Sequence, residues 1–349
     1  MEKEALLWKK LVNEKAECTA CARRCKIPEG SKGFCFVRQN KKGRLYLENY
    51  GILEAIQIDP IEKKPFNHFY PGSSVLGIGT SSCNFGCLFC QNKNISKMHE
   101  IKGHYFSPED IVELAEKNNV DGIAYTYNEP AIFAEYAFDV AELAKRRGLF
   151  NVFVTNGFLT DETIDMMKGK IDAAVVGLKG NGEQKFSNKF EMVVSNDPVK
   201  EALKKMKKNG IHIEITDLII PKVGESLDAC DKLTKWISKE LGDETPIQFT
   251  RFYPDYKMNE YKPTSMESLK LHYDTAKKNG LKYVYIGNVP GNEFENTYCA
   301  KCGSIAVERF GHYIKKWNIN ENNRCAECGE SILVKGRFNK RQEHIKVLK

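Results

Sequence analysis

The central part of the chain repeats one local pattern, in which cationic residues and a glycine separate an amphipathic segment from a short apolar one. The pattern occurs over residues 144–148, 206–210 and 276–280, and each time an apolar run follows directly. A glycine in this place suits the left-handed residue that ends many helices, and the cations before it favour the negative end of the helix dipole. Each apolar run then predicts a strand, so helices and strands alternate along the chain.

We expect seven such strands, and their order along the chain determines the class of fold. They lie near residues 75–80, 122–127, 150–155, 172–178, 211–218, 247–252 and 282–287. Strands that alternate with helices form a parallel sheet, and six or seven units suggest a partial or complete (β/α) barrel. The prediction is therefore an α/β chain with a partial (β/α)6-type, TIM-like barrel over residues 71–290. Such barrels carry their active sites at the carboxyl ends of the strands.

Length, composition and charge exclude several classes of protein. The chain has 349 residues, of which 42% are hydrophobic and 28% are charged, as in a soluble globular protein. No apolar run is long enough to span a bilayer, and the N-terminus lacks the apolar stretch of a signal peptide, so we expect a cytoplasmic protein without a membrane partner. The net charge of +7 suits an acidic protein partner, small anions or nucleic acid. Because the cationic residues are scattered, a solvated surface is favoured over nucleic-acid binding.

Twelve cysteines indicate metal binding, since a cytosolic chain uses them as metal ligands more often than in disulfides. Eleven fall into three spaced groups, and Cys230 stands alone in a predicted helix. The middle group, Cys83, Cys87 and Cys90, follows the first predicted strand with the spacing C-x3-C-x2-C. Three thiolates leave one iron of a [4Fe-4S] cluster without a protein ligand, and that iron can bind and activate a second molecule. A zinc knuckle or a set of buried thiols is the alternative, but structural zinc takes four ligands and no histidine is close by.

The run over residues 77–92 resembles the signature of the radical S-adenosylmethionine (SAM) superfamily, in which an aromatic residue stands before the third cysteine. The resemblance implies that the three cysteines hold the cluster and that Phe89 lies against the adenine of SAM. It also implies that the cluster, reduced by a flavodoxin or a ferredoxin-type donor, cleaves SAM to methionine and a 5′-deoxyadenosyl radical. That radical would abstract hydrogen from a substrate.

Three predicted strands end in residues that resemble short segments of the radical SAM activases. Asn128 and Glu129, after the second strand, would accept hydrogen bonds from the SAM ammonium, although Pro130 also makes this segment a plain helix start. Asn156 lies in a Thr-Asn-Gly segment after the third strand, where a simple turn is the alternative. Lys179, at the end of the fourth strand, would reach the SAM carboxylate unless it is only a solvated lysine.

The fifth predicted strand alternates isoleucines with His212, Glu214 and Thr216. Side chains of a strand alternate between its two faces, so these polar residues share one face and predict a polar lumen that binds the SAM ribose or a substrate. An edge strand that faces water is the alternative. On the sixth strand, Arg251 would meet a SAM carboxylate or a substrate anion, or else form a structural ion pair.

Two further cysteine groups lie outside the predicted barrel and define flanking modules. The first, in a module over residues 1–70, closes either a tetrahedral zinc site or an auxiliary iron–sulfur cluster: Cys18, Cys21, Cys25 and Cys35. The second, in a module over residues 291–349, forms the two C-x2-C-G knuckles of a predicted zinc ribbon: Cys299, Cys302, Cys325 and Cys328. We expect this ribbon to serve for docking or as a lid.

The whole layout resembles the radical SAM proteins of the AmmeMemoRadiSam system, which are relatives of pyruvate formate-lyase activating enzyme. The flanking cysteines and the segments over residues 58–65 and 68–72 carry this likeness, beside the central loop. Segment 59–72 either lines the active site or only fastens the N-terminal module to the barrel. The function that we expect is a radical SAM oxidoreductase whose substrate is unidentified and can be a protein. The alternatives are a glycyl-radical enzyme activase and, in another class, a multi-zinc module that binds nucleic acid or protein.

Overall fold

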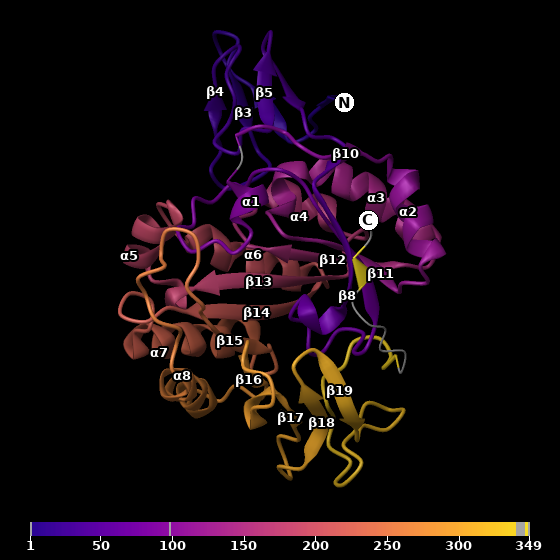
Figure 1. Ribbon diagram of the computed structural model, residues 1–349, viewed down its shortest axis with the longest axis vertical. Helices are drawn as coiled ribbons and strands as arrows, with labels where there is room; N and C mark the ends of the chain where they lie inside the picture. The colour runs from indigo at the N-terminus through magenta and orange to yellow at the C-terminus, as the bar shows by residue number, and fades with distance from the viewer. Residues whose placement is uncertain (1, 98, 340–345, 348–349) are drawn as a thin grey trace.

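The computed structural model in Figure 1 describes residues 2–97, 99–339 and 346–347 and is built around one large sheet. Its nine strands follow the order β16-β15-β14-β13-β12-β11-β9-β8-β20. The neighbours from β9 to β16 pair in parallel, whereas β8 and β20 pair antiparallel to their neighbours. The strands are β8 (Ala55–Pro60), β9 (Ser74–Gly79), β11 (Gly122–Tyr125), β12 (Phe150–Thr155), β13 (Ala173–Lys179), β14 (His212–Ile219), β15 (Ile247–Arg251), β16 (Val284–Gly287) and β20 (Lys346–Val347).

The parallel part of the sheet confirms the seven predicted strands in place and direction. Consecutive strands are neighbours, so the connections turn in one sense and leave the helices on one side of the sheet. Within the described residues β16 pairs in this sheet with β15 alone, so the barrel stays open. β14 lies between β13 and β15. The alternative of an edge strand over residues 211–218 is therefore wrong.

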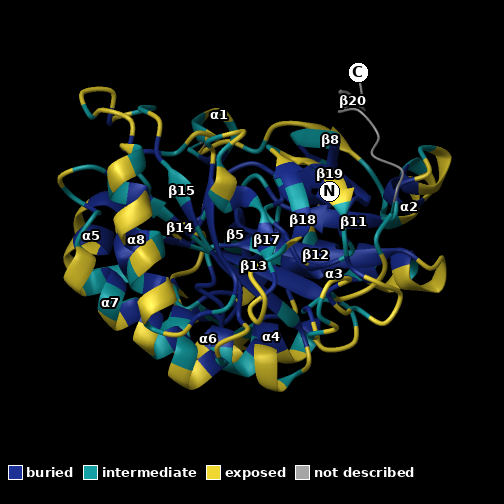
Figure 2. Cartoon of the chain, turned by 90° about the horizontal axis from the view of Figure 1, so that it is seen from below, coloured by how far each residue is buried: buried dark blue, intermediate teal, exposed yellow. Residues whose placement is uncertain are grey.

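The longer helices of the described chain cover the outer face of this curved sheet. They are α2 (Pro108–Lys117), α3 (Ala134–Arg146), α4 (Asp161–Met167), α6 (Asp197–Lys208), α7 (Leu227–Trp236) and α8 (Met266–Lys278). Figure 2 shows their exposed residues on the outside and buried residues toward the strands. Two short helices, α1 (Lys93–Ser96) and α5 (Gln184–Phe186), lie in the connections after β9 and β13.

Local sequence signals set where these helices begin and end. The Ser107 hydroxyl accepts a hydrogen bond from the Asp110 amide (3.1 Å), and the Asp110 carboxylate accepts one from the Ser107 amide (2.7 Å), which forms a capping box before α2. After α3, α6 and α8 the chain turns with positive φ angles at Gly148 (76°), Gly210 (79°) and Gly280 (86°). These angles confirm the predicted helix ends.

Small antiparallel sheets form the two ends of the long axis of the molecule, with the curved sheet between them (Figure 1). The N-terminal end contains the sheets β1-β6-β5 and β2-β3-β4, and the C-terminal end contains the sheet β17-β18-β19. β7 and β10 pair in a separate two-stranded sheet. These strands are β1 (Lys3–Glu4), β2 (Trp8–Lys10), β3 (Ala16–Cys18), β4 (Lys26–Ile27), β5 (Arg38–Lys41), β6 (Arg44–Leu47), β7 (Ile52–Leu53), β10 (His104–Tyr105), β17 (Thr297–Tyr298), β18 (Ile305–Phe310) and β19 (Tyr313–Trp317).

A buried ion pair fastens the N-terminal end to helix α3. The side chains of Arg38 and Glu135 are each 1% exposed, and Arg38 Nη1 donates to Glu135 Oε1 over 2.9 Å. The same Glu135 oxygen accepts hydrogen bonds from the amides of Leu6 and Leu7. Burial alone raises the pKa of Glu135, but the Arg38 guanidinium overcomes this effect and holds the pKa below its usual range. Arg38 therefore keeps the buried Glu135 ionised, and each residue compensates the buried charge of the other.

Replacing Arg38 by alanine would leave Glu135 buried without a counter-ion. We expect Arg38→Ala to lower the free energy of unfolding by about 3–5 kcal/mol, measured by urea denaturation. Arg44→Ala is the matched control, because Arg44 pairs with Glu4 at the surface, where the side chains are 64% and 42% exposed. An exposed pair contributes about 1 kcal/mol or less. Equal losses in the two variants would contradict the role of the buried pair.

The C-terminal end is fastened to β16 and to the segment that precedes β9. His68 Nε2 lies 2.6 Å from the Tyr285 hydroxyl, and His68 Nδ1 lies 2.6 Å from the carbonyl oxygen of Leu333. Arg309 of β18 donates to the carbonyl oxygen of Asn67 over 3.0 Å. The segment before β9 therefore holds the C-terminal module, a contact that the sequence did not indicate.

Asp217 is a buried carboxyl group on the face of β14 opposite to Thr216. Its Oδ1 accepts a hydrogen bond from the Asn181 amide over 3.1 Å. Its Oδ2 has no hydrogen-bond partner among the described residues. Burial raises the pKa of Asp217 from 3.8 to about 7. Between about pH 4 and pH 7 the folded protein therefore keeps a proton that the unfolded chain has lost.

The free energy of unfolding should fall as the pH rises from about 4 to about 7, because the folded state binds one proton more than the unfolded chain in this range. We expect Asp217→Asn to gain about 2–3 kcal/mol of unfolding free energy relative to the wild type between pH 5 and pH 8, at about 1.36 kcal/mol per pKa unit. Denaturant titrations at the two pH values measure this gain. Asp274→Asn serves as the control, since Asp274 is 50% exposed and pairs with Lys270 on α8. A control that gained as much would exclude Asp217 as the cause.

Candidate functional site

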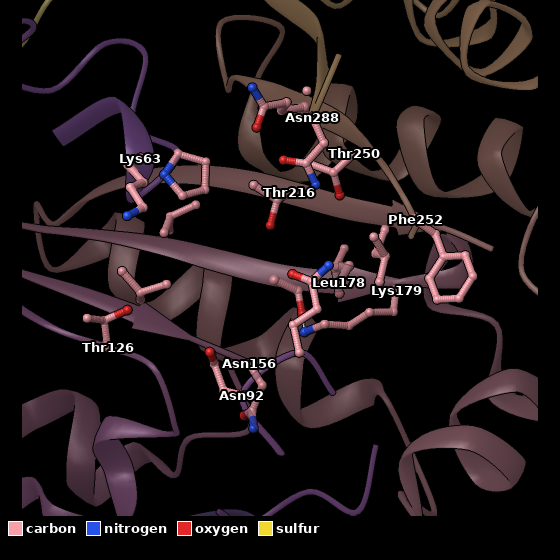
Figure 3. Close-up of a pocket in the computed structure, with 18 of the residues that line it drawn as sticks. Lys63, Asn92, Thr126, Asn156, Leu178, Lys179, Thr216, Thr250, Phe252 and Asn288 are labelled. Atoms are coloured by element: carbon pink, nitrogen blue, oxygen red, sulfur yellow. Dashed lines mark hydrogen bonds between the residues drawn. The ribbon is translucent and has the colours of Figure 1, made fainter. Parts of the chain in front are cut away.

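A cavity of about 730 Å³ lies at the carboxyl ends of the parallel strands. Six strands in succession each contribute a polar side chain to its lining at or near the strand end (Figure 3): Thr126, Asn156, Lys179, Thr216, Thr250 and Asn288. This is the end of the sheet at which (β/α) barrels bind their substrates. The cavity therefore lies where the sequence predicted an active site.

The loop after β9 brings Cys83, Cys87 and Cys90 to one wall of this cavity. Burial raises the pKa of Cys83 to about 11 and that of Cys87 well above its usual range. Free thiols at Cys83 and Cys87 would therefore stay protonated, and a bound cationic metal group would stabilise their thiolate forms. Among the described residues their three sulfur atoms do not gather within 4.8 Å of one another. The three sulfur atoms are therefore not gathered as they would be around a single metal ion.

Close packing at Gly86 determines the shape of the cysteine loop. The Gly86 amide donates to the carbonyl oxygen of Glu191, and the Leu88 amide donates to that of Phe190, each over 2.9 Å. A Cβ atom on Gly86 would come within 2.4 Å of Met192 Sδ, so a larger residue would displace Met192. The loop is thus held against the segment that follows β13.

Phe89 gives the cavity an apolar wall beside the cysteines. It lines the cavity and is 5% exposed. Its ring centre lies 5.8 Å from that of Phe186, in a cluster that also contains Phe252. An adenine ring would meet an aromatic surface here, as the resemblance implied, and the contact itself stays a prediction.

Glu129 connects the ends of β11 and β12 from a buried position in the cavity wall. Its Oε1 accepts a hydrogen bond from the Thr155 hydroxyl, and its Oε2 accepts one from the Asn156 amide, each over 2.7 Å. Burial raises the pKa of Glu129, and these hydrogen bonds act against that effect. Because Oε2 accepts one hydrogen bond in this arrangement, it keeps a second lone pair for a ligand donor.

Asn128 and Asn156 both line the cavity, and both hold the cysteine loop. Asn128 Nδ2 donates to the Thr80 hydroxyl (2.9 Å) and to the carbonyl oxygen of Ser82 (2.8 Å). Asn156 Nδ2 donates to Asn84 Oδ1 over 2.7 Å. Asn128 thus uses both of its amide N–H donors on the loop and Asn156 uses one, which supports a positioning role for both residues.

Lys179 is a cation beside the acidic groups of this cavity. It lines the cavity and donates to the carbonyl oxygen of Gly177. Burial raises the pKa of Glu129 and of Glu191, and Lys179 acts against that effect in both. The Lys179 side chain therefore lies near these carboxyl groups, which argues against the alternative of a merely solvated lysine.

The polar face of β14 reaches the cavity only at Thr216. Thr216 is part of the lining, whereas His212 and Glu214 are not. The two oxygens of Glu214 accept hydrogen bonds from the amides of Asn67 and His68, each over 2.9 Å. The segment before β9 thus fills the lumen below Thr216, and Glu214 holds that segment in place.

Arg251 does not line the cavity, whereas its neighbours Thr250 and Phe252 do. Side chains alternate along β15, so Arg251 points to the other face of the strand. Its guanidinium lies 5.4 Å from the ring centre of Tyr253, and its Nε has no hydrogen-bond partner among the described residues. The structure does not bring Arg251 together with the other candidate SAM contacts.

The opposite wall of the cavity comes largely from residues that the sequence did not single out. Glu62 and Lys63 of the short 3-10 helix η1 (Ile61–Lys63) line it, a role that the sequence left open for this segment. Arg309 and His312 reach it from the β18–β19 hairpin, and no sequence signal pointed to them. The C-terminal module therefore contributes directly to the candidate site.

This wall contains buried polar atoms that lack a hydrogen-bond partner within the described part of the chain. Glu62 Oε2 and Arg309 Nε have no hydrogen-bond partner among the described residues. Burial raises the pKa of Glu62 to about 7. Its carboxyl group can therefore give or take a proton near neutral pH.

The C-terminal cysteines form a compact group whose four sulfur atoms all lie within 4.8 Å of one another. Two of the separations are 3.5 Å, between Cys299 and Cys328, and 3.8 Å, between Cys302 and Cys325. A tetrahedral site with metal–sulfur bonds of about 2.3 Å spaces its sulfur atoms by about 3.8 Å. This group can therefore bind a single metal ion.

The N-terminal cysteines line a second, smaller cavity together: Cys18, Cys21, Cys25 and Cys35. Within the described part of the chain, no three of their sulfur atoms lie within 4.8 Å of one another. All four side chains thus face one space, but with a wider spacing than in the C-terminal group.

A family model described as the radical SAM superfamily matches residues 78–237, from the end of β9 to the end of α7. The chain belongs to the radical SAM superfamily. Members of this superfamily are enzymes, and membership implies a [4Fe-4S] cluster and SAM as cofactors. None of the helices that the structure describes has the length and apolar character needed to cross a membrane.

Relatives of this radical SAM protein extend the match over nearly the whole chain. An uncharacterized protein of Methanocaldococcus jannaschii is 43% identical over 333 residues, which are 95% of this chain and 98% of that protein. A putative glycyl-radical enzyme activating enzyme of the same organism is 24% identical over 203 residues, 56% of this chain and 81% of that protein. A solved radical SAM methyltransferase from Sphaerobacter thermophilus matches with a TM-score of 0.50 and 13% identity, over 63% of this chain and 68% of that one. This last likeness concerns the fold alone.

Proposed function

We propose that this chain is a SAM-cleaving oxidoreductase that holds its [4Fe-4S] cluster on Cys83, Cys87 and Cys90 and receives electrons from a flavodoxin or a ferredoxin-type donor. When bound, the cluster supplies the electron that splits SAM into methionine and a 5′-deoxyadenosyl radical, which takes a hydrogen atom from the substrate. The observation that carries this proposal is that these three cysteines line a cavity of about 730 Å³ to which no fourth described cysteine contributes. A ligand can therefore approach the metal from the cavity.

The chain's own residues would orient SAM in this cavity. Glu129 Oε2 would accept a hydrogen bond from the SAM ammonium, and Lys179 would pair with the SAM carboxylate. Phe89 would cover the adenine, and Thr216 would meet the ribose. The support for this arrangement is that an acceptor, a cation, an aromatic wall and a hydroxyl line the same cavity as the cysteines.

The substrate would lie between the cysteine loop and the wall that carries Glu62, Arg309 and His312. That wall offers a carboxyl group, a guanidinium and an imidazole. We therefore propose a polar substrate with both hydrogen-bond donors and acceptors, and a protein substrate would have to insert a side chain or a loop. The four C-terminal cysteines would bind zinc and so stabilise the hairpin that carries Arg309 and His312.

A glycyl-radical activase is the second candidate, and the relative described as a putative activating enzyme favours it. In that reaction the hydrogen atom would come from a glycine of a partner protein. The contribution of the C-terminal module to the cavity favours a substrate enclosed by this chain instead. Electron paramagnetic resonance (EPR) on mixtures with candidate partners separates the two, because an activase would produce a doublet on the partner.

Removal of one loop cysteine should abolish SAM cleavage. We expect Cys87→Ala to lose iron and to form 5′-deoxyadenosine only at the rate without enzyme, when dithionite and SAM are added to anaerobically reconstituted protein. Cys230→Ala is the matched control, because Cys230 is a buried thiol on α7 outside the cavity lining. Product formation by Cys87→Ala at the wild-type rate would refute the proposed mechanism.

Loss of the Lys179 charge should weaken SAM binding more than it alters protein stability. We expect Lys179→Met to raise the KM for SAM by about 10–100-fold, the range for a lost hydrogen bond to a charged group. Lys185→Met is the control, because Lys185 is exposed on α5. An unchanged KM in Lys179→Met would show that this lysine does not contact SAM.

A further inference from the structure

The four N-terminal cysteines enclose a space that is apolar apart from a few polar groups. Cys18, Cys21 and Cys35 are buried and Cys25 is half-buried, and all four line the same cavity. Its lining also includes apolar residues such as Ile27. Four thiols that face one desolvated space form a ligand set, because unligated thiols gain little from being gathered there.

The sulfur atoms of this set are more widely spaced than those of the C-terminal group, which favours a multi-iron cluster over a zinc ion. A zinc ion draws four thiolates to about 3.8 Å from one another, and the C-terminal group has this spacing. In the described part of the chain, no three N-terminal sulfur atoms come within 4.8 Å of one another. A [4Fe-4S] cluster binds each thiolate on a different iron and therefore holds the sulfur atoms farther apart.

Asn84 connects this second cysteine set to the loop that carries Cys83. It follows Cys83 directly, lines the N-terminal cavity, and places its Oδ1 3.7 Å from Cys83 Sγ. Its Nδ2 is buried and has no hydrogen-bond partner among the described residues. Burial raises the pKa of Cys21, and the Asn84 side chain beside it acts in the opposite direction. One amide side chain therefore lies next to a sulfur atom of each set.

Arg23 places a positive charge near thiols of both sets. Its Nε donates to the carbonyl oxygen of Asn84, and its guanidinium lies 3.7 Å from the ring centre of Phe34. Burial lowers the pKa of Arg23, and thiols of both sets act against that effect: Cys21, Cys25, Cys83 and Cys35. A cation in this position favours an added negative charge on either side of it.

We propose that Cys18, Cys21, Cys25 and Cys35 hold a second, redox-active [4Fe-4S] cluster that passes one electron to the cluster on the Cys83 loop. The relay, though not the second cluster itself, rests on the proposed function. In this step the N-terminal cluster goes from the 1+ to the 2+ state and the loop cluster from the 2+ to the 1+ state. A low-potential one-electron donor of the flavodoxin or ferredoxin class then reduces the N-terminal cluster again.

The first experiment asks which metal the N-terminal set holds, independently of SAM chemistry. The full chain carrying Cys83→Ala, Cys87→Ala and Cys90→Ala is reconstituted anaerobically with iron and sulfide. We expect about four iron and four sulfide per chain, about one zinc from the C-terminal group, and the EPR signal of a reduced [4Fe-4S] cluster after dithionite. About two zinc per chain and no iron would overturn the proposal.

The second experiment tests the charge of Arg23 in this triple variant. We expect Arg23→Gln to lower the ratio of reduced to oxidised N-terminal cluster about tenfold at a fixed potential, which corresponds to about 59 mV for one electron. Arg24→Gln is the matched control, because Arg24 pairs with Glu162 at the surface. An equal change in both variants would refute the placement of Arg23 beside the cluster.

The third experiment tests the relay in a chain with the loop cysteines intact. Cys18→Ser with Cys35→Ser removes two of the four N-terminal ligands. We expect 5′-deoxyadenosine formation to fall at least about tenfold more with reduced flavodoxin than with dithionite, which can reduce the loop cluster directly. An equal fall with the two reductants would overturn the relay and leave the second cluster standing. Absence of product from the wild-type chain would instead refute the proposed function.

Discussion

The convergence of parallel strand ends on one cavity is the constraint on which the rest of the structure depends. Each strand presents alternate residues to the lumen, so each offers a side chain at the depth of the cavity. The ladders keep these residues level, as the pairing of Gly177 with Thr216 and of Thr216 with Gln248 shows. An open barrel leaves gaps around such a cavity, and the cysteine loop and the β18–β19 hairpin occupy different parts of its wall. The flanking modules are thus part of the site.

One strand face serves two purposes at different depths. Strand residues rise by about 3.3 Å each, so Glu214 lies about 7 Å below Thr216 on the same face. At the lower level the Glu214 carboxylate accepts hydrogen bonds from two backbone amides. Phe69 stacks there on His212, with ring centres 5.8 Å apart. At the upper level Thr216 faces the cavity. Burial of the lower groups closes the lumen from below.

Periodic and local signals predicted the sheet and much of the site lining, because both depend on neighbours in the sequence. The seven strands, the glycine-terminated helices and the inward face of β14 belong to this class. Side chains alternate along β15, and Arg251 lies between Thr250 and Phe252, which both line the cavity. This alternation already argued against a contact between Arg251 and SAM. The contacts that the sequence did not reveal are those between residues far apart in the chain. The amides of Asn67 and His68, which donate to the Glu214 carboxylate, come from more than 140 residues earlier. The spacing of sulfur atoms, which separates the two flanking cysteine groups, is likewise a property of the folded chain.

The hydrogen bond from Arg309 to Asn67 spans 242 positions of the chain. On the ribosome, the strands and the cysteine loop are therefore made well before the hairpin that completes the far wall of the cavity. A nascent chain has an interval in which Cys83, Cys87 and Cys90 are present and this wall is missing. Until the hairpin folds, the loop that carries these cysteines therefore faces a more open cavity than in the complete chain.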